Sequence, residues 1–364
     1  MKTVSKIGDL KGKKILLRVN FDVAINEKGE ITERFKIDKQ KEMINWLMDK
    51  GAKTVMLTHS SQVDSFINLV PQLAAYLGRE LGIIKSVNEV SNYLGNYKGL
   101  ALLDNIRQNN GEKKNDPELG RRLASGFDIF INNDFAECHR EYMSVSAITN
   151  FLPSYAGLLL EKETDQLEAL INTPKEGKII ILGGAKASTK IPVIKNFLNK
   201  SDKVLVGGVI SNDILKAKGV NIGQSVADDN CKELLSGLNL NDVRIILPED
   251  FNILEDKIFD IGPKAIKNFT DIVGSAKMII WNGPLGVFED DRFATGTNRV
   301  AEAIAESNAF KVLGGGDTVA AVDKLGLLDK FDFVSTGGGA MLAFLAGNRL
   351  PGLEALGYYE SRWK

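Results

Sequence analysis

Short runs of β-branched and aliphatic residues alternate with longer amphipathic stretches along the whole sequence. This alternation is typical of βαβ units and predicts an α/β fold with mainly parallel sheets. We expect helices over 37–50, 68–81, 117–126, 189–200, 210–219, 262–275 and 295–307. The expected strands are KILLRV (14–19), TVMLT (54–58), GLALL (99–103), DIFIN (128–132), KIIIL (178–182), KVLVG (203–207), MIIW (278–281), FKVL (310–313) and FVST (333–336).

The residues that follow these strands divide the chain into two halves. Strands of the first half run into polar and charged residues, whereas each strand of the second half runs into glycine. Ligands of open α/β sheets bind at the carboxyl ends of the strands. The pattern therefore predicts two sheets with different tasks, one presenting cationic and amide side chains to a small anion and the other presenting bare backbone to a polyphosphate.

A chain of 364 residues is long enough for two domains, each with a full core. We expect an N-terminal domain over 1–155, with the tail 350–364 packing back on it, and a C-terminal domain over 156–349. A long helix that begins near the boundary would join the two.

Composition excludes several classes of protein. A net charge of −1 argues against a dedicated nucleic-acid or membrane-surface binder. No apolar run approaches the roughly 20 residues of a membrane span, and the N-terminus lacks the apolar stretch of a secretory signal. Cys138 and Cys231 have no partner spacing, which fits a reducing cytoplasm. Nothing in the sequence requires more than a monomer.

The segment LGGAKASTK places two lysines at the expected start of a helix, directly after the glycine pair Gly183 and Gly184. Lys186 and Lys190 are four residues apart and can share one helix face. A solvated lysine face is the ordinary alternative, but the position after two glycines favours neutralisation of phosphate charge in phosphoryl transfer. No Walker A pattern occurs, so the chain is not a P-loop enzyme.

Two further segments of the second half carry candidate ligand groups. Three glycines, Gly314, Gly315 and Gly316, precede Asp317 at an expected helix start, where backbone amides bind phosphate and a carboxylate binds Mg²⁺. The segment WNGPLGVFE begins with Asn282 and ends with Glu289. That carboxylate is a candidate acceptor for ribose hydroxyls, and an exposed Glu without function is the alternative.

The first half holds the complementary set of groups. The two histidines of the chain, His59 and His139, each fall at an expected strand end. Arg107 and Arg140 could bind an anion through two parallel hydrogen bonds, and Lys36 lies within reach of the same face.

These residues sit in motifs that resemble phosphoglycerate kinases. The motifs are GEKKNDPE, HR, FLPSYAG, LGGAK, DIGP, WNGPLGVFE, GGGDT, STGGGA and LPGLEAL, in this order. The resemblance as a whole runs from about residue 3 to residue 356. The resemblance implies two Rossmann-like three-layer αβα domains that close like a hinge. It also implies reversible, Mg²⁺-dependent phosphoryl transfer between ATP and the carboxylate of 3-phosphoglycerate, which gives ADP and 1,3-bisphosphoglycerate.

The resemblance also implies roles for individual residues. The catalytic groups would be Lys36, Lys186, Lys190, Gly315 and Gly316, and Asp317 would bind the metal. The residues that would bind 3-phosphoglycerate are Arg18, Asn20, Asp22, Lys36, His59, Arg107 and Arg140. The residues that would bind the nucleotide are Gly183, Gly184, Ala185, Lys186, Lys190, Gly207, Gly208, Phe259, Asn282, Pro284, Glu289, Gly314, Gly315, Gly316, Asp317 and Thr318.

Departures from the family pattern concentrate in the first half. The family has RVDFNVP where this chain has RVNFDVA, so Asn20 replaces an acid and Asp22 replaces an amide. In the segment THSSQV, Gln62 stands where the family has an arginine. Lys36 also replaces an arginine, and NNDFAECHR brings Asp134 and Glu137 close to the expected anion site. In the second half, Thr189 replaces an aspartate, and the segment near 248–259 is shortened.

Two alternatives therefore stay open. The chain could be an ATP-dependent kinase of another small carboxylate, or a nucleotide-binding protein with little turnover. A dinucleotide-dependent dehydrogenase is disfavoured, because no G-x-G-x-x-G opens a helix with an acidic residue about 20 positions later.

Overall fold

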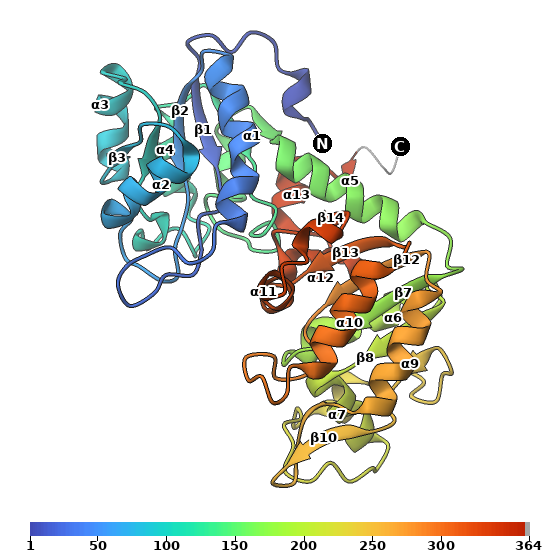
Figure 1. Ribbon diagram of the computed structural model, residues 1–364. Coiled ribbons are helices and arrows are strands. Elements are labelled where there is room, and N and C mark those ends of the chain that lie inside the picture. Colours follow the sequence, from blue (N-terminus) through green and yellow to red (C-terminus); the bar gives the residue numbers. More distant parts are fainter. Residues whose placement is uncertain (361–364) are drawn as a thin grey trace. The chain divides into compact units, whose positions relative to one another are not determined.

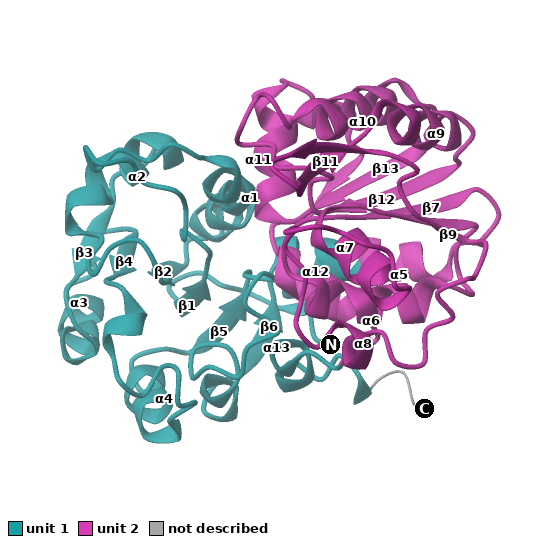
Figure 2. Ribbon diagram, turned by 90° about the horizontal axis from the view of Figure 1, so that it is seen from below, with its two compact units in different colours: residues 1–165, 349–364 teal, residues 166–348 magenta. Residues whose placement is uncertain are grey.

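In the computed structural model, which describes residues 1–360, the chain forms two compact units (Figure 2). Unit 1 comprises Met1–Asp165 and the chain from Arg349 onward, and unit 2 comprises Gln166–Asn348. Residues 361–364 of the expected C-terminal tail lie outside the described residues.

The first boundary falls inside the helix α5 (Leu158–Asn172), later than the boundary after residue 155 that the sequence predicts. The start of α5 belongs to unit 1, where the Leu159 N–H donates to Asn133 Oδ1 at 2.9 Å. The end of α5 belongs to unit 2, where Lys178 Nζ donates to the carbonyl of Leu170 at 2.7 Å. A lysine there complements the negative end of the helix dipole.

Unit 1 is built on a six-stranded parallel sheet in the order β3-β4-β2-β1-β5-β6 (Figure 1). Its strands are β1 (Lys14–Arg18), β2 (Lys53–Leu57), β3 (Gly82–Ile84), β4 (Ala101–Leu103), β5 (Ile129–Asn132) and β6 (Ser154–Ala156). Its helices are α1 (Phe35–Asp49), α2 (Val70–Leu77), α3 (Val90–Gly95), α4 (Pro117–Ala124) and α13 (Pro351–Ala355).

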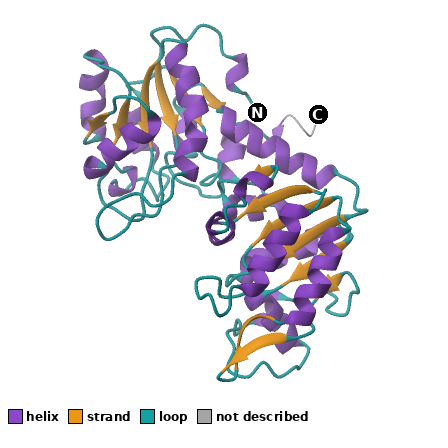
Figure 3. Cartoon of the chain, in the orientation of Figure 1, coloured by secondary structure: helices purple, strands orange, loops and turns teal. Residues whose placement is uncertain are grey.

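Helices cover both faces of this sheet because its strands are apolar on both sides. Within β1, Ile15 and Leu17 pack in a core with α1 and α2, whereas Leu16 packs in a second core with α3 and α4. This alternation follows the two-residue period of a strand. Unit 1 is therefore a three-layer αβα sandwich (Figure 3).

Unit 2 holds a second six-stranded parallel sheet, in the order β14-β13-β12-β7-β8-β9. Helices α9 and α10 lie on one face of it, and α6 and α12 lie on the other (Figure 2). The strands of unit 2 are β7 (Lys178–Leu182), β8 (Lys203–Val206), β9 (Ile245–Ile246), β10 (Phe251–Leu254), β11 (Lys257–Ile261), β12 (Met278–Asn282), β13 (Phe310–Gly314) and β14 (Phe333–Val334). Besides the end of α5, the helices of unit 2 are α6 (Ala187–Phe197), α7 (Gly208–Ala217), α8 (Cys231–Leu234), α9 (Pro263–Gly274), α10 (Thr295–Glu306), α11 (Gly316–Lys324) and α12 (Gly338–Leu345).

The predicted fold class, α/β with two mainly parallel sheets, is confirmed. The sequence missed the antiparallel hairpin of β10 and β11. Its turn holds Glu255 and Asp256 at φ 48° and 61°, a conformation that hairpin turns usually fill with Asn and Gly. Among the described residues, no helix is both long enough and apolar enough to cross a membrane.

The C-terminal helix α13 packs on unit 1 through a close backbone contact. The Gly352 N–H donates to the carbonyl of Cys138 at 2.9 Å. A Cβ atom on Gly352 would lie 2.8 Å from Val145 Cγ1 and 3.0 Å from Cys138 Cα, and the latter is a backbone atom that cannot rotate away. Glycine is therefore required where the returning chain meets the loop after β5.

We expect Gly352→Ala to lower the free energy of unfolding of unit 1 by about 1–3 kcal/mol, because the added methyl group overpacks this contact. Gly8→Ala is the matched control, because a Cβ there meets no atom within 4 Å. Urea unfolding followed by circular dichroism measures both. Equal midpoints for the two variants would contradict a tight contact at Gly352.

Candidate functional site

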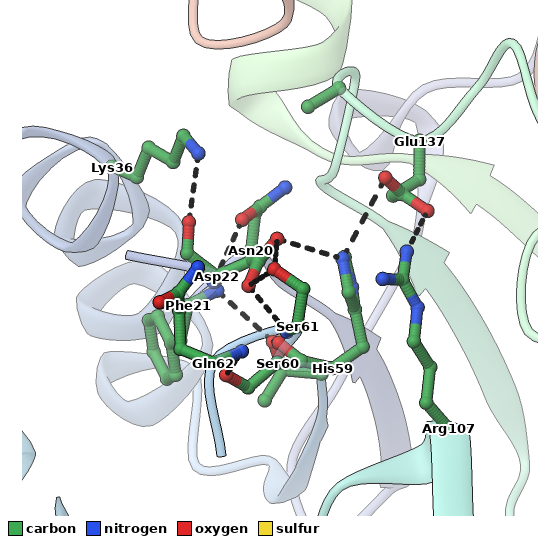
Figure 4. A network of polar contacts seen from close by, with 12 residues as sticks. Asn20, Phe21, Asp22, Lys36, His59, Ser60, Ser61, Gln62, Arg107 and Glu137 are labelled. Atoms are coloured by element: carbon green, nitrogen blue, oxygen red, sulfur yellow. Dashed lines mark hydrogen bonds and ion pairs between the residues drawn. The ribbon is translucent and has the colours of Figure 1, made fainter. Parts of the chain in front are cut away.

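The strand order of unit 1 gathers polar side chains that are distant in the sequence. Strands β4, β2, β1 and β5 are neighbours, and Arg18 at the end of β1 is in register with Leu57 of β2 and Asn132 of β5. The loops after these strands form one cluster of polar groups, drawn in Figure 4. We call it the strand-end cluster of unit 1: residues 18–22, 36, 59–62, 107 and 134–137.

Arg18 is fully buried at the base of this cluster. Its guanidinium donates to the carbonyl of Val19 at 2.8 Å and to Ser144 Oγ at 3.1 Å. It also forms an ion pair with Asp134, which is equally buried, at 3.1 Å. Burying either side chain without the other would be strongly unfavourable, so the ion pair is a structural requirement of this buried position. Arg18, expected to bind substrate, lies beneath the surface of the cluster.

The remaining contact of Arg18 determines the tautomer of His59. Arg18 Nη2 lies 3.1 Å from His59 Nδ1. A guanidinium can only donate hydrogen bonds, so Nδ1 accepts and the ring proton is on Nε2. That Nε2–H lies 3.6 Å from Asp22 Oδ2 and 3.6 Å from Glu137 Oε1. The imidazole therefore presents a single N–H to two carboxylates (Figure 4).

Asp22 is fixed by several donors. Its Oδ1 accepts from the Ser61 N–H at 2.7 Å and from Ser61 Oγ at 2.9 Å. Burial raises the pKa of this carboxyl, but its contacts with His59 and Ser61 outweigh burial and hold the pKa well below its usual range. Lys36, in the first turn of α1, donates from Nζ to the carbonyl of Asp22 at 2.8 Å. Asn20 donates to Asp134 Oδ1 at 3.0 Å and accepts from the Asp22 N–H at 3.0 Å.

Glu137 completes the cluster by joining two of the expected anion ligands. Its Oε2 accepts from Arg107 Nη2 at 2.9 Å, and the side chains of Glu137 and Arg107 are 12% and 19% exposed. Burial raises the pKa of Glu137, but its electrostatic interactions with His59, Arg18 and Arg107 outweigh burial and lower it.

The structure brings Arg18, Asn20, Asp22, Lys36, His59 and Arg107 together through these contacts. Arg140 differs, because it is exposed and its side chain forms no hydrogen bond or ion pair within residues 1–360. His139 Nδ1 lies 2.9 Å from the carbonyl of Ala136, and burial and the charge of Arg140 lower its pKa. Gln62 is exposed.

Glycine turns form the corresponding edge of unit 2. The loops after β7 and β12 touch backbone to backbone, so that a Cβ on Gly183 would clash with the carbonyl of Pro284. Gly315, which caps the N-terminus of α11, has φ +92°, a conformation that other residues rarely adopt. Both glycines are therefore required by the backbone itself.

A cavity of about 400 Å³ opens beside these turns. Its walls are mainly apolar, and Phe259 of the wall stacks on Phe293 with 4.5 Å between ring centroids. An apolar slot with a few polar groups suits a planar heteroaromatic ligand. The residues that line it are Gly184, Ala185, Gly208, Val209, Ser211, Asn212, Val226, Phe251, Lys257, Ile258, Phe259, Asp260, Ile261, Pro284, Leu285, Gly286, Val287, Glu289 and Asp317.

Seven expected nucleotide ligands line this cavity: Gly184, Ala185, Gly208, Phe259, Pro284, Glu289 and Asp317. The others are outside its lining. They are Gly183, Lys186, Lys190, Gly207, Asn282, Gly314, Gly315, Gly316 and Thr318. The sequence did not identify several wall residues, including Asn212, Val226 and Val287, because isolated apolar and amide residues carry no motif.

The charged groups near the glycine turns differ in exposure. Lys190, in the first turn of α6, is 7% exposed, whereas Lys186 and Asp317 are exposed. Burial lowers the pKa of Lys190, and the charge of Lys186 adds to this effect, while Asp317 opposes it. The charge of Lys190 at the start of α6 therefore interacts with the charge of Asp317 at the start of α11.

Asn282 is the last residue of β12, and its side chain lies beside Gly314 and Gly315. Its carbonyl accepts from the Gly183 N–H at 3.0 Å, and the next N–H, of Gly283, donates to Thr318 Oγ1 at 2.7 Å. The side-chain amide nitrogen of Asn282 is buried and has no hydrogen-bond partner among residues 1–360. A buried donor without a partner is unfavourable unless a ligand supplies an acceptor.

Asp260 is a buried acid in the cavity wall that the sequence did not single out. Its Oδ2 accepts from the Gly296 N–H at 2.7 Å and its Oδ1 from the Ile261 N–H at 2.9 Å. Burial raises its pKa to about 6, although both hydrogen bonds oppose the shift. The carboxyl group connects β11 to the start of α10, and both segments support the cavity.

Comparison with known proteins adds an independent observation. The family model described as phosphoglycerate kinase matches residues 4–348. The chain is 39% identical to a phosphoglycerate kinase of Dictyoglomus turgidum, with 96% of each chain covered. It is 37% identical to one of Francisella philomiragia over the same shares. A crystal structure of phosphoglycerate kinase from Pyrococcus horikoshii matches with a TM-score of 0.88 at 29% identity, covering 100% of both chains. A structure of phosphoglycerate kinase from Coxiella burnetii matches with a TM-score of 0.81 at 30% identity, covering 98% of both.

The raised pKa of Asp260 predicts a specific pH dependence of stability. Between about pH 4 and pH 6 the folded chain keeps a proton on this carboxyl that the unfolded chain has lost, so the free energy of unfolding falls as pH rises. We expect the wild type to lose on the order of 2 kcal/mol relative to Asp260→Asn across this range. Urea unfolding at several pH values measures it. Parallel curves for the two proteins would contradict the burial effect.

Proposed function

Because the chain belongs to the phosphoglycerate kinase family, we propose that it transfers the terminal phosphoryl group of ATP reversibly to the carboxylate of 3-phosphoglycerate. The products are ADP and 1,3-bisphosphoglycerate, as in glycolysis. The observation that carries this proposal is the contrast between the two strand edges: bare glycine turns beside an apolar cavity in unit 2, and cationic side chains in unit 1.

The nucleotide is the ligand that we propose for the cavity of unit 2. Its base would occupy the apolar slot beside Phe259, and its ribose hydroxyls would donate to Glu289, which is exposed and lines the same cavity. The phosphates would extend toward the N–H groups of Gly315 and Gly316 at the start of α11. Lys190 and the unpartnered amide of Asn282 then supply donors to the terminal phosphate.

The charged groups present fit a magnesium ion bound together with the nucleotide. Asp317 offers an exposed carboxylate in the cavity lining, and residues 1–360 contain no group of three or more His, Cys, Asp or Glu side chains that could hold a metal alone. Mg²⁺ prefers one or two carboxylates plus phosphate oxygens. When bound, it would neutralise charge on the phosphates during transfer.

The acceptor would bind at the strand-end cluster of unit 1. His59, Arg107 and Arg140 would hold its anionic groups, and Lys36 would approach the moving phosphoryl group. The acceptor carboxylate is already ionised at neutral pH, so its oxygen attacks the γ-phosphorus without a general base. The new O–P bond forms while the bond from the γ-phosphorus to the ADP oxygen breaks, and ADP leaves with the electron pair.

Catalysis in this scheme consists of positioning and charge neutralisation. The ammonium groups of Lys186 and Lys190 and the N–H groups of Gly315 and Gly316 would stabilise the charge on the phosphoryl oxygens. We further propose that the protein acts in the cytoplasm as a monomer, which agrees with two cysteines that are both free thiols.

A coupled assay with ATP, Mg²⁺ and 3-phosphoglycerate tests this function directly. We expect turnover with 3-phosphoglycerate to exceed turnover with every other small carboxylic acid in a parallel panel. A higher kcat/KM for a different carboxylate would instead support the alternative acceptor that the altered residues of unit 1 leave open. No turnover with any acid would overturn the kinase proposal.

Lys190→Ala should lower kcat by about 100-fold or more and change the KM for ATP much less, because its contact strengthens mainly in the transition state. Lys195→Ala is the matched control on the same helix, since Lys195 is exposed and within residues 1–360 its ammonium group forms a hydrogen bond only with the carbonyl of Leu234. Steady-state kinetics with both variants measures the two constants. Equal losses in kcat and in ATP binding would contradict a role in transfer.

A further inference from the structure

Glu137 lies between Arg107 and His59, two hydrogen-bond donors that an incoming anion would need. Its two carboxylate oxygens reach in different directions, Oε2 to Arg107 Nη2 at 2.9 Å and Oε1 toward His59 Nε2 at 3.6 Å (Figure 4). A carboxylate that spans both groups has the charge and the geometry of a bound ligand. The cluster is therefore occupied by a group of the protein itself.

The other acids of the cluster are committed to structural contacts. Asp134 is fully buried against Arg18 and also accepts from Asn20. Asp22 accepts from both the backbone and the side chain of Ser61. Glu137 differs from both, because among residues 1–360 its carboxylate makes close polar contacts only with Arg107 and His59 and accepts no backbone hydrogen bond. It can leave by side-chain rotation alone.

Arg107 has a contact that does not depend on Glu137 and that would keep its side chain in position if Glu137 moved away. Its guanidinium lies over the ring of Tyr142, 5.7 Å from the ring centroid. Its Nε is buried and has no hydrogen-bond partner among residues 1–360, so Glu137 satisfies Arg107 only in part. A phosphate group has enough oxygens to accept from Nε and Nη2 together, which is the favoured geometry of arginine with phosphate.

We propose that Glu137 is a resident anion that sets the affinity of the acceptor site, and that the phosphate group of the acceptor displaces it from Arg107 and His59. The proposal rests on the proposed function for the identity of that acceptor. Displacement lowers the apparent affinity of every anion by the same factor, the fraction of molecules in which the site is free. Small anions that bind only through Arg107 and His59 are thereby excluded, whereas a ligand with further contacts still binds.

The test is direct binding to the full chain, measured by calorimetry without nucleotide, for 3-phosphoglycerate and for inorganic phosphate. Glu137→Gln removes the charge and keeps an oxygen that can accept from Arg107. We expect it to tighten binding of both ligands by about tenfold, and by similar factors. In kinetics, the KM for 3-phosphoglycerate should fall by a similar factor.

Glu118→Gln is the matched control, because it removes an equal charge from an exposed pair with Arg121 in unit 1, outside the cluster. It should bind both ligands as the wild type does. Glu137→Ala provides a second variant if the glutamine protein does not fold. Unchanged or weaker binding by Glu137 variants that do fold would overturn the proposal, because Glu137 would then support Arg107 rather than compete for it.

The two proposals fail in different ways. Tighter binding by Glu137→Gln, with no turnover by either protein, would support the resident anion and overturn the kinase function. Turnover by both proteins with equal affinities would support the kinase function and overturn the resident anion.

Discussion

Both units depend on one geometric constraint, the parallel alignment of strands in a sheet. Parallel strands end at the same edge, and each is followed by a loop that can carry any side chain without disturbing the core. In unit 1 this constraint brings residues from positions 18–22, 59–62, 107 and 134–137 into one network of contacts. In unit 2 it brings together the glycine turns after β7, β12 and β13. The two parallel sheets therefore present different groups at their edges, because the loops that follow their strands differ.

In the strand-end cluster of unit 1, a chain of polar contacts runs from a buried ion pair to carboxylates at the surface. The buried pair of Arg18 and Asp134 fixes the ring of His59, and His59 in turn faces Asp22 and Glu137 at the surface of the cluster. Asp134 and Glu137 both depart from the family pattern, but the structure gives them different environments. Asp134 balances a charge that would otherwise be buried alone, whereas Glu137 pairs with a cation that a ligand can reach.

The sequence predicted the fold class, because apolar runs of about five residues that alternate with amphipathic stretches are strong local signals. Each expected strand overlaps an observed one. The short strands β3, β6 and β9 were missed, since two or three residues carry little pattern. The pairing of Glu137 with Arg107 could not be read either, because the two residues are 30 positions apart and meet only through the sheet order. Asp260 was missed for a related reason, since burial, not residue type, sets its pKa.

Unit 1 is assembled from two segments that are far apart in the chain, whereas unit 2 is one continuous segment. The contact of Gly352 with Cys138 and the hydrogen bond from the Met1 amino group to the carbonyl of Gly357 close unit 1. During synthesis on the ribosome, unit 2 is complete once residue 348 has emerged. The first segment of unit 1 is synthesised before unit 2 and its second segment after unit 2. The strands of the first segment therefore emerge without α13, and unit 1 can complete its packing only after α13 has been translated.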